Sequence, residues 1–127
     1  MKLDHRIDEQ ARRVFMTIGE GATGAAASRY IAALAAGRPE LSGWDWIQDV
    51  RESTGEVDNS DIEAVARAFG STGRCWTVFV SHDPNLHLWC KVMDAMFDGR
   101  LHLAAPTPEA AVMALETARA GADLVVA

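Results

Sequence analysis

The stretch CWTVFVS, residues 75–81, decides the predicted fold because it is apolar on both of its faces. Its side chains alternate with a period of two, which is typical of a strand. One face carries Trp76, Val78 and Val80, and the other carries Cys75, Thr77 and Phe79. A strand that is apolar on both faces indicates a sheet buried between helices. The sequence therefore predicts a central strand here, in an α/β protein.

Helical patterns flank this strand on both sides. Before it, Ser60-Asp61-Ile62-Glu63 matches a capping box, with Ser60 as N-cap and Glu63 at position N3. After it, Asp83-Pro84 is typical of an N-cap followed by proline at position N1. The second helix carries apolar residues at helical spacing, and we expect all of them, Trp89 included, to face the core: Leu86, Trp89, Cys90, Met93 and Phe97.

Strands and helices continue to alternate toward both ends of the chain. Further strands are predicted at 44–50 and 100–104, further helices at 24–36 and 107–119, and an antiparallel hairpin at 2–7 and 12–20. The order β-β-α-β-α-β-α-β-α implies parallel pairs joined by right-handed crossovers. We expect an α/β single domain, residues 1–127, with a mixed, mostly parallel sheet flanked by helices. Gly121 is expected to end the last helix, leaving 121–127 as a loose tail.

Composition limits the classes of function. The chain has 127 residues, with 18 Asp and Glu against 12 Lys and Arg, a net charge of −6. That charge argues against a nucleic-acid partner, which would need clustered Lys and Arg. The sequence has neither the apolar run of a membrane span nor an apolar leader, which favours a cytoplasmic protein. We expect Cys75 and Cys90 to be small core residues, with a disulfide between them as the alternative.

Several segments together resemble a family of small bacterial proteins, the STAS or anti-sigma-factor-antagonist group, and within it the SpoIIAA-like proteins also described as STAS/SEC14-like. The resemblance covers residues 3–119. It rests on the hairpin ending Gly19-Glu20-Gly21, on the capped helix at 60–63, and on the segments 46–51, 76–80 and 106–111.

The resemblance implies a phosphorylation switch and a class of function. In anti-sigma-factor antagonists a serine at the start of the helix after the third strand is phosphorylated, and Ser60 falls at that place in Val57-Asp58-Asn59-Ser60-Asp61-Ile62. The family's usual Asp-Ser-Ser-Gly-Leu is not reproduced, and a plain N-cap is the alternative role. The resemblance implies a non-enzymatic module, with lipid or apolar-ligand binding in some relatives.

The carboxyl ends of parallel strands bind ligands in open α/β sheets, so this edge is the expected ligand site. The residues predicted to lie there are Glu20, Arg51, Ser53, His82 and Asp83, with Thr54 beside them. The sequence lacks the Gly-x-Ser-x-Gly elbow of hydrolases, a glycine-rich phosphate loop and the His-Glu-x-x-His metal motif. We therefore expect no enzyme activity, no cofactor and no metal.

Large apolar side chains suggest either a contact surface or a pocket. The candidate residues are Trp44, Trp46, Trp89, Met93 and Phe97. Aromatic residues are enriched at the centres of interfaces, so we expect docking on a protein partner or on a second copy as a homodimer. The alternative is a carrier of a small apolar or lipid-like ligand, held in a pocket between the sheet and the helices.

Overall fold

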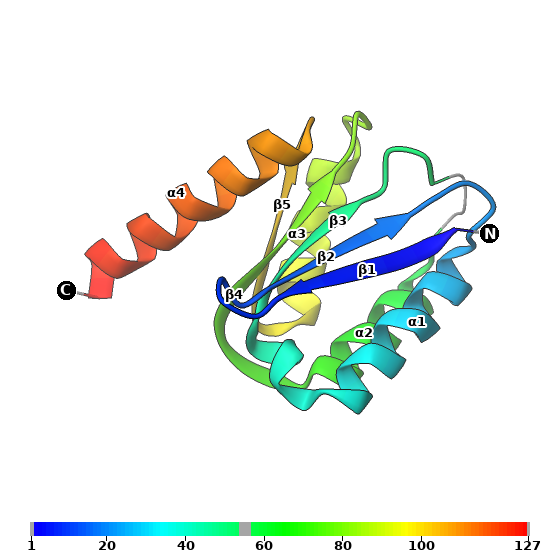
Figure 1. Ribbon diagram of the computed structural model, residues 1–127, viewed down its shortest axis with the longest axis horizontal. Helices are drawn as coiled ribbons and strands as arrows, with labels where there is room; N and C mark the ends of the chain where they lie inside the picture. Colours follow the sequence, from blue (N-terminus) through cyan, green and yellow to red (C-terminus); the bar gives the residue numbers. More distant parts are fainter. Residues whose placement is uncertain (1, 54–56, 127) are drawn as a thin grey trace.

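A computed structural model describes residues 2–53 and 57–126, and side chains as far as Ala122. These residues form a five-stranded mixed sheet, four α-helices and one short 3₁₀ helix (Figure 1). In chain order the elements are β1 (Leu3–Asp8), β2 (Arg13–Ile18), α1 (Gly24–Gly37), the 3₁₀ helix (Pro39–Gly43), β3 (Asp45–Asp49), α2 (Asn59–Phe69), β4 (Ser71–Val80), α3 (Leu86–Met96), β5 (Asp98–Ala105) and α4 (Pro108–Val126).

The sheet confirms the predicted α/β class. Its strands lie side by side in the order β1-β2-β3-β4-β5, with β1 antiparallel to β2 and every other pair parallel. Ile47 of β3 pairs with Val78 of β4, and Thr77 of β4 pairs with His102 of β5. This register aligns side chains from three neighbouring strands on each face of the sheet.

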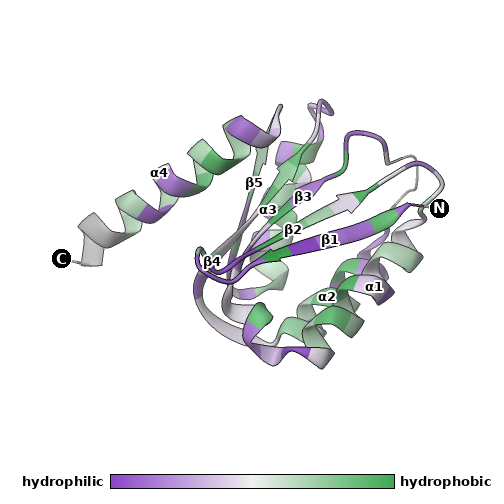
Figure 2. Ribbon diagram, in the orientation of Figure 1, coloured by the Kyte–Doolittle hydropathy of each residue, from purple (hydrophilic) through white to green (hydrophobic). Residues whose placement is uncertain are grey.

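The face of the sheet under α4 is packed with apolar side chains. Ile47, Trp76 and Val78 lie buried against Ala111 and Leu115 of α4. The buried carboxylate of Asp45 links β3 to β4 and to α4. It accepts hydrogen bonds from the Trp76 backbone N–H (3.0 Å) and from Nε of Arg119. Figure 1 shows α4 alone on this side, and Figure 2 shows hydrophobic and hydrophilic stretches alternating along it.

The opposite face of the sheet is covered by α1, α2 and α3. Val14 and Met16 of β2 pack against Ile31 of α1, and Trp46 of β3 packs against Phe69 of α2. The fully buried Trp46 indole donates a hydrogen bond to the Leu41 carbonyl at 2.9 Å, which satisfies its polar atom. Under α3, a smaller cluster joins Cys90 and Met93 to Ile62 of α2.

Three element boundaries differ from the sequence prediction. The N-cap of α2 is Asp58 rather than Ser60, because the Asp58 and Asp61 side chains complete the capping box two residues earlier. The Asp83 side chain accepts a hydrogen bond from the Asn85 N–H, forming a turn, and α3 begins only at Leu86. Helix α4 passes through Gly121 to Val126, since a glycine costs a helix about 1 kcal/mol but leaves its hydrogen bonds intact.

The sequence prediction also missed the first residues of the two strands next to α3. β4 begins at Ser71 and β5 at Asp98, and a register shift between Ser71 and Cys75 marks the added, mostly exposed segment. Gly99 has a φ of 101°, and a Cβ there would lie 2.2 Å from the Thr72 carbonyl oxygen. Only glycine therefore allows the two strands to approach each other at this irregularity.

The two cysteines are buried and free, as predicted. Burial, with a smaller contribution from Asp94, raises the pKa of the Cys90 thiol to about 11. The thiol is therefore protonated at neutral pH and behaves as a small apolar side chain.

Candidate ligand-binding pocket

A pocket of about 690 Å³ lies between the sheet and the three helices that share one face. It starts above the middle of β3, β4 and β5 and reaches the carboxyl ends of β3 and β4. This is the edge at which open α/β sheets bind ligands. The volume falls within the range of roughly 300–1,000 Å³ typical of small-molecule sites.

The walls of the pocket are apolar. α1 contributes Ile31, α2 contributes Ile62 and Val65, and α3 contributes Trp89 and Met93. The prediction that Trp89 faces the core was wrong, because this side chain is 40% exposed. Helix α3 centres its buried stripe on Cys90 and Met93. Trp89, one position before Cys90, is rotated by about 100° and lies on the flank that borders the pocket.

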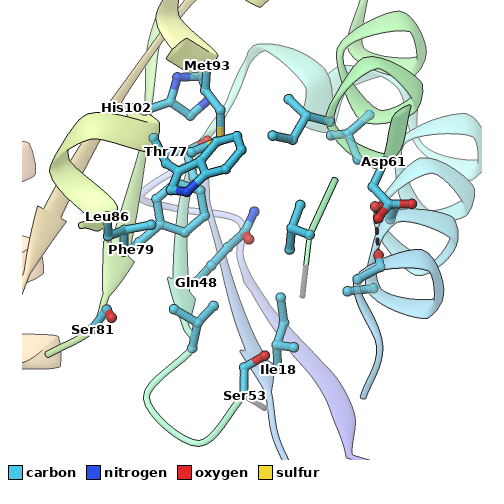
Figure 3. Close-up of a pocket in the computed structure, with 18 of the residues that line it drawn as sticks. Ile18, Gln48, Ser53, Asp61, Thr77, Phe79, Ser81, Leu86, Met93 and His102 are labelled. Atoms are coloured by element: carbon cyan, nitrogen blue, oxygen red, sulfur yellow. Dashed lines mark hydrogen bonds between the residues drawn. The ribbon is translucent and has the colours of Figure 1, made fainter. Parts of the chain in front are cut away.

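The floor of the pocket is polar. Gln48, Thr77 and His102 come from three neighbouring strands and are all buried. Thr77 and His102 are register partners on β4 and β5, so their backbones lie about 5 Å apart. Figure 3 shows the Gln48 amide directed into the space that the other labelled residues surround.

The Gln48 amide is an uncommon feature of a buried strand. Gln48 is only 6% exposed, and its side chain forms no hydrogen bond with any residue that the structure describes. An amide that loses water without gaining another partner costs about 1–3 kcal/mol, so a molecule that covers Gln48 must replace the hydrogen bonds of that water. The Gln48 amide is not among the buried side-chain atoms without a partner, so it reaches the open space of the pocket, where water or a bound molecule can pair with it.

His102 is held in one orientation by Asp94 of α3. One oxygen of Asp94 accepts hydrogen bonds from the His102 backbone N–H (2.7 Å) and from the ring Nδ1 (3.0 Å). Since a carboxylate only accepts, the proton is assigned to Nδ1, and a neutral ring then carries a lone pair on Nε2. Burial lowers the pKa of His102 to about 4, outweighing the opposite effect of Asp94. The imidazole is therefore an uncharged acceptor at neutral pH.

Arg100 supports the floor from below. The guanidinium of this fully buried arginine donates through Nη1 to the Trp76 carbonyl and the Thr77 hydroxyl, each at 3.0 Å. Through Nη2 it donates to the Ser42 and Trp44 carbonyls, each at 2.7 Å. The Thr77 oxygen thus accepts from Arg100, and its hydroxyl proton has no acceptor among the described residues. This proton is available to a molecule in the pocket.

The mouth of the pocket brings together four of the five predicted ligand-edge residues. Arg51, Ser53, His82 and Asp83 all border it, whereas Glu20 does not. The Arg51 guanidinium binds Asp49 at 2.7 Å, and this hydrogen bond lowers the pKa of the Asp49 carboxyl. The one base of the predicted edge is therefore already paired. Thr54 lies outside the described residues.

The other predicted site residues are distributed between the pocket and the core. Trp89, Met93 and Phe97 line the pocket, whereas Trp44 and Trp46 do not. The predicted phosphorylation site is not part of this pocket lining. Ser60 is exposed in the first turn of α2, and its hydroxyl donates to the Asp58 carboxylate at 2.6 Å. Phosphorylation of Ser60 stays a prediction, and a phosphate there would adjoin two carboxylates, those of Asp58 and Asp61.

Sequence reasoning missed the floor of the pocket. Gln48, Thr77 and His102 are single polar residues in apolar strands, and that contrast was the signal that could have identified them. Among the residues that the structure describes, no group of three or more His, Cys, Asp or Glu side chains is placed to hold a metal ion. Within the same residues, no helix combines the length and apolarity needed to cross a membrane.

The arrangement is suited to binding a molecule through hydrogen bonds at the floor and apolar contacts at the walls. A scan against protein-family models found no match, and searches of curated proteins and of solved structures found no significant similarity.

Proposed function

We propose that this chain is a non-enzymatic binding domain for a small, mostly apolar molecule, held in the pocket between the sheet and helices α1, α2 and α3. The observation that carries the proposal is the Gln48 amide, which faces the floor of a 690 Å³ pocket with apolar walls and has no partner among the described residues. An apolar lining with a few convergent polar groups is the usual composition of a ligand site. The STAS-like assignment stays part of the proposal, and the parallel sheet after an N-terminal hairpin is compatible with it.

Binding of the uncharged, environment-sensitive dye N-phenyl-1-naphthylamine tests this proposal. We expect saturable binding of one dye per chain, measured by its fluorescence. Val65→Trp fills part of the pocket with an indole ring and should therefore weaken dye binding at least about tenfold. Met113→Trp is the control, because Met113 of α4 is 68% exposed and lies outside the pocket lining.

Two results would contradict the proposal. One is the absence of saturable dye binding by the folded wild-type protein. The other is an equal effect of Val65→Trp and Met113→Trp on binding, which would place the dye outside the pocket. Circular dichroism of each variant would verify that the fold is retained in both cases.

Docking of a second copy of the chain is a second candidate function, favoured by the outer side of α3. Leu88 is 66% exposed and Val92 is 44% exposed, one helical turn apart, beside the partly exposed Trp89. We propose that this strip is the contact between two copies in a homodimer. Sedimentation at tens of micromolar should show a dimer, and Leu88→Glu should return it to a monomer. A monomeric wild-type protein would contradict this candidate.

A further inference from the structure

The hydrogen-bonding groups at the pocket floor define the kind of polar group that can bind there. The Gln48 amide offers donors on its nitrogen and an acceptor on its oxygen, and no described protein group uses either. The Thr77 hydroxyl adds a donor, because its oxygen already accepts from Arg100. The His102 ring adds an acceptor at Nε2, because its Nδ1 proton is held by Asp94. The floor thus presents donors and acceptors together.

We infer that the ligand is an uncharged amphiphile whose polar end is a carboxamide or an equivalent group with a donor and an acceptor side by side. This end binds Gln48, Thr77 and His102, and the apolar body extends between the helices toward the mouth. The inference rests on the proposed function of the pocket. A carboxamide carbonyl can accept from Thr77 and Gln48, while its N–H groups donate to His102 and Gln48.

A charged polar end fits this floor poorly. Neither of the two charged groups beside the floor lines the pocket: Asp94 accepts from His102, and Arg100 donates through Nη1 and Nη2 to four neutral oxygen atoms. A ligand carboxylate would only accept and would therefore face the lone pairs of His102 and of the Gln48 oxygen. An ammonium group would only donate and would face the donors of Thr77 and Gln48. Either ion would be buried without a counter-charge in direct contact at the floor.

The polar end points inward because of the position of Gln48. If the apolar body lay over the floor instead, the Gln48 amide would lose water and gain no hydrogen bond in exchange. At the mouth, the Arg51 guanidinium is paired with Asp49 and remains in contact with solvent. The mouth therefore gains little from a polar ligand group, whereas the floor requires one.

A matched series of eight-carbon compounds tests this inference. Octanamide, octanoate and octylammonium share one apolar body and differ in the charge and hydrogen-bonding pattern of the polar end. Titration calorimetry at pH 7.5 should give octanamide an affinity at least about tenfold higher than that of either ion. An octanoate or octylammonium affinity equal to or above that of octanamide would overturn the inferred ligand class.

Gln48→Met provides the second measurement, because methionine keeps the length of the side chain and removes its amide. We expect this variant to bind octanamide at least about tenfold more weakly and to lose the preference over octanoate. Gln10→Met makes the same change on the exposed turn between β1 and β2 and should leave all affinities unchanged. An unchanged preference for octanamide in Gln48→Met would overturn the assigned role of Gln48.

Failure of the inference is distinguishable from failure of the proposed function. If the apolar dye binds in the pocket and octanamide shows no preference or no binding, the ligand class is wrong and the binding function stands. If neither the dye nor any compound of the series binds to the folded protein, the proposed function itself is wrong.

Discussion

On the face of the sheet under α4, Ile47, Val78 and Leu115 pack against one another, and the buried carboxylate of Asp45 is fully engaged. On the opposite face, Gln48 and His102 come from the same sheet but border a pocket. One face is closed by a single helix, whereas the other is covered by three helices that leave a space between them.

The comparison shows that one strand can supply core residues to one face of the sheet and binding residues to the other. Neighbouring residues of β3 point to opposite faces, so Ile47 contributes to a dry core while Gln48 contributes to the pocket floor. The same strands thus supply stability on one side and binding groups on the other. Substitutions should separate these two contributions, because side chains that only border the pocket contribute little to the free energy of unfolding.

The largest expected effect is on the pocket side, at Arg100. Arg100→Met removes the donors of four hydrogen bonds and leaves the Trp44 carbonyl without its partner. We expect the free energy of unfolding to fall by about 3–5 kcal/mol, measured by urea denaturation. Arg74→Met, at an exposed position of β4, is the control and should change it by less than about 0.5 kcal/mol. A loss below about 1 kcal/mol at Arg100 would show that its network is dispensable.

The direct test of the two faces uses neighbouring residues of β3. Ile47→Ala should lower the free energy of unfolding by about 2–4 kcal/mol, since it leaves a cavity in the packed core under α4. Gln48→Ala should lower it by less than about 1 kcal/mol, because the amide has no protein partner to lose. Equal losses in chemical denaturation would mean that the pocket side is packed as tightly as the other face.

The pH dependence of stability should report on His102. Its folded-state pKa of about 4 lies below the ordinary value of 6.5, so the unfolded chain binds the proton first as the pH falls. The stability present above pH 6.5 is therefore lost as the pH falls toward 4, by about 2 kcal/mol between pH 7 and pH 5. Around the ring, Asp94 of α3 favours the charged form, whereas Arg100 of β5 opposes it.

His102→Gln isolates this contribution from that of other titrating groups. The variant should show a shallower fall in stability between pH 7 and pH 5 than the wild-type protein. His87→Gln, at an exposed position of α3, should keep the wild-type slope. A His102→Gln slope identical to wild type would contradict the assigned pKa of His102.

The two faces also differ in how far the sequence predicts them. The period of two assigned Trp76, Val78 and Val80 to one face and Cys75, Thr77 and Phe79 to the other, and the structure confirms both sets. This succeeded because alternation along one strand is a local property. The class and the direction of the strands followed from the alternation of elements, which is also readable locally.

The pocket floor was not predicted because it depends on register between strands. Gln48, Thr77 and His102 are each separated by 25 or more residues in the chain, and only the pairing of β3, β4 and β5 brings them together. The cap of α2 failed for a different reason. Asp58 with Asp61 and Ser60 with Glu63 both fit the spacing of a capping box, so the local pattern allowed two starting points.

The smallest expected effect comes from two matched helix caps, one on each face. Thr23 accepts a hydrogen bond from the Ala26 N–H (3.0 Å) at the start of α1, and Thr107 accepts one from the Ala110 N–H (3.1 Å) at the start of α4. Each Thr→Ala substitution should cost about 1 kcal/mol, and Thr→Ser should restore most of it. Ser60→Ala, which removes no cap, should cost less than about 0.5 kcal/mol.

Only Thr23 borders the pocket, so the matched caps also separate stability from binding. With equal losses of stability, a change in dye affinity at Thr23→Ala alone would show that the start of α1 shapes the pocket mouth. An equal change in dye affinity at Thr107→Ala would instead mean that binding responds to stability in general. In that case, the assignment of stability to one face and of binding to the other would be wrong, because α4 contacts only the packed face.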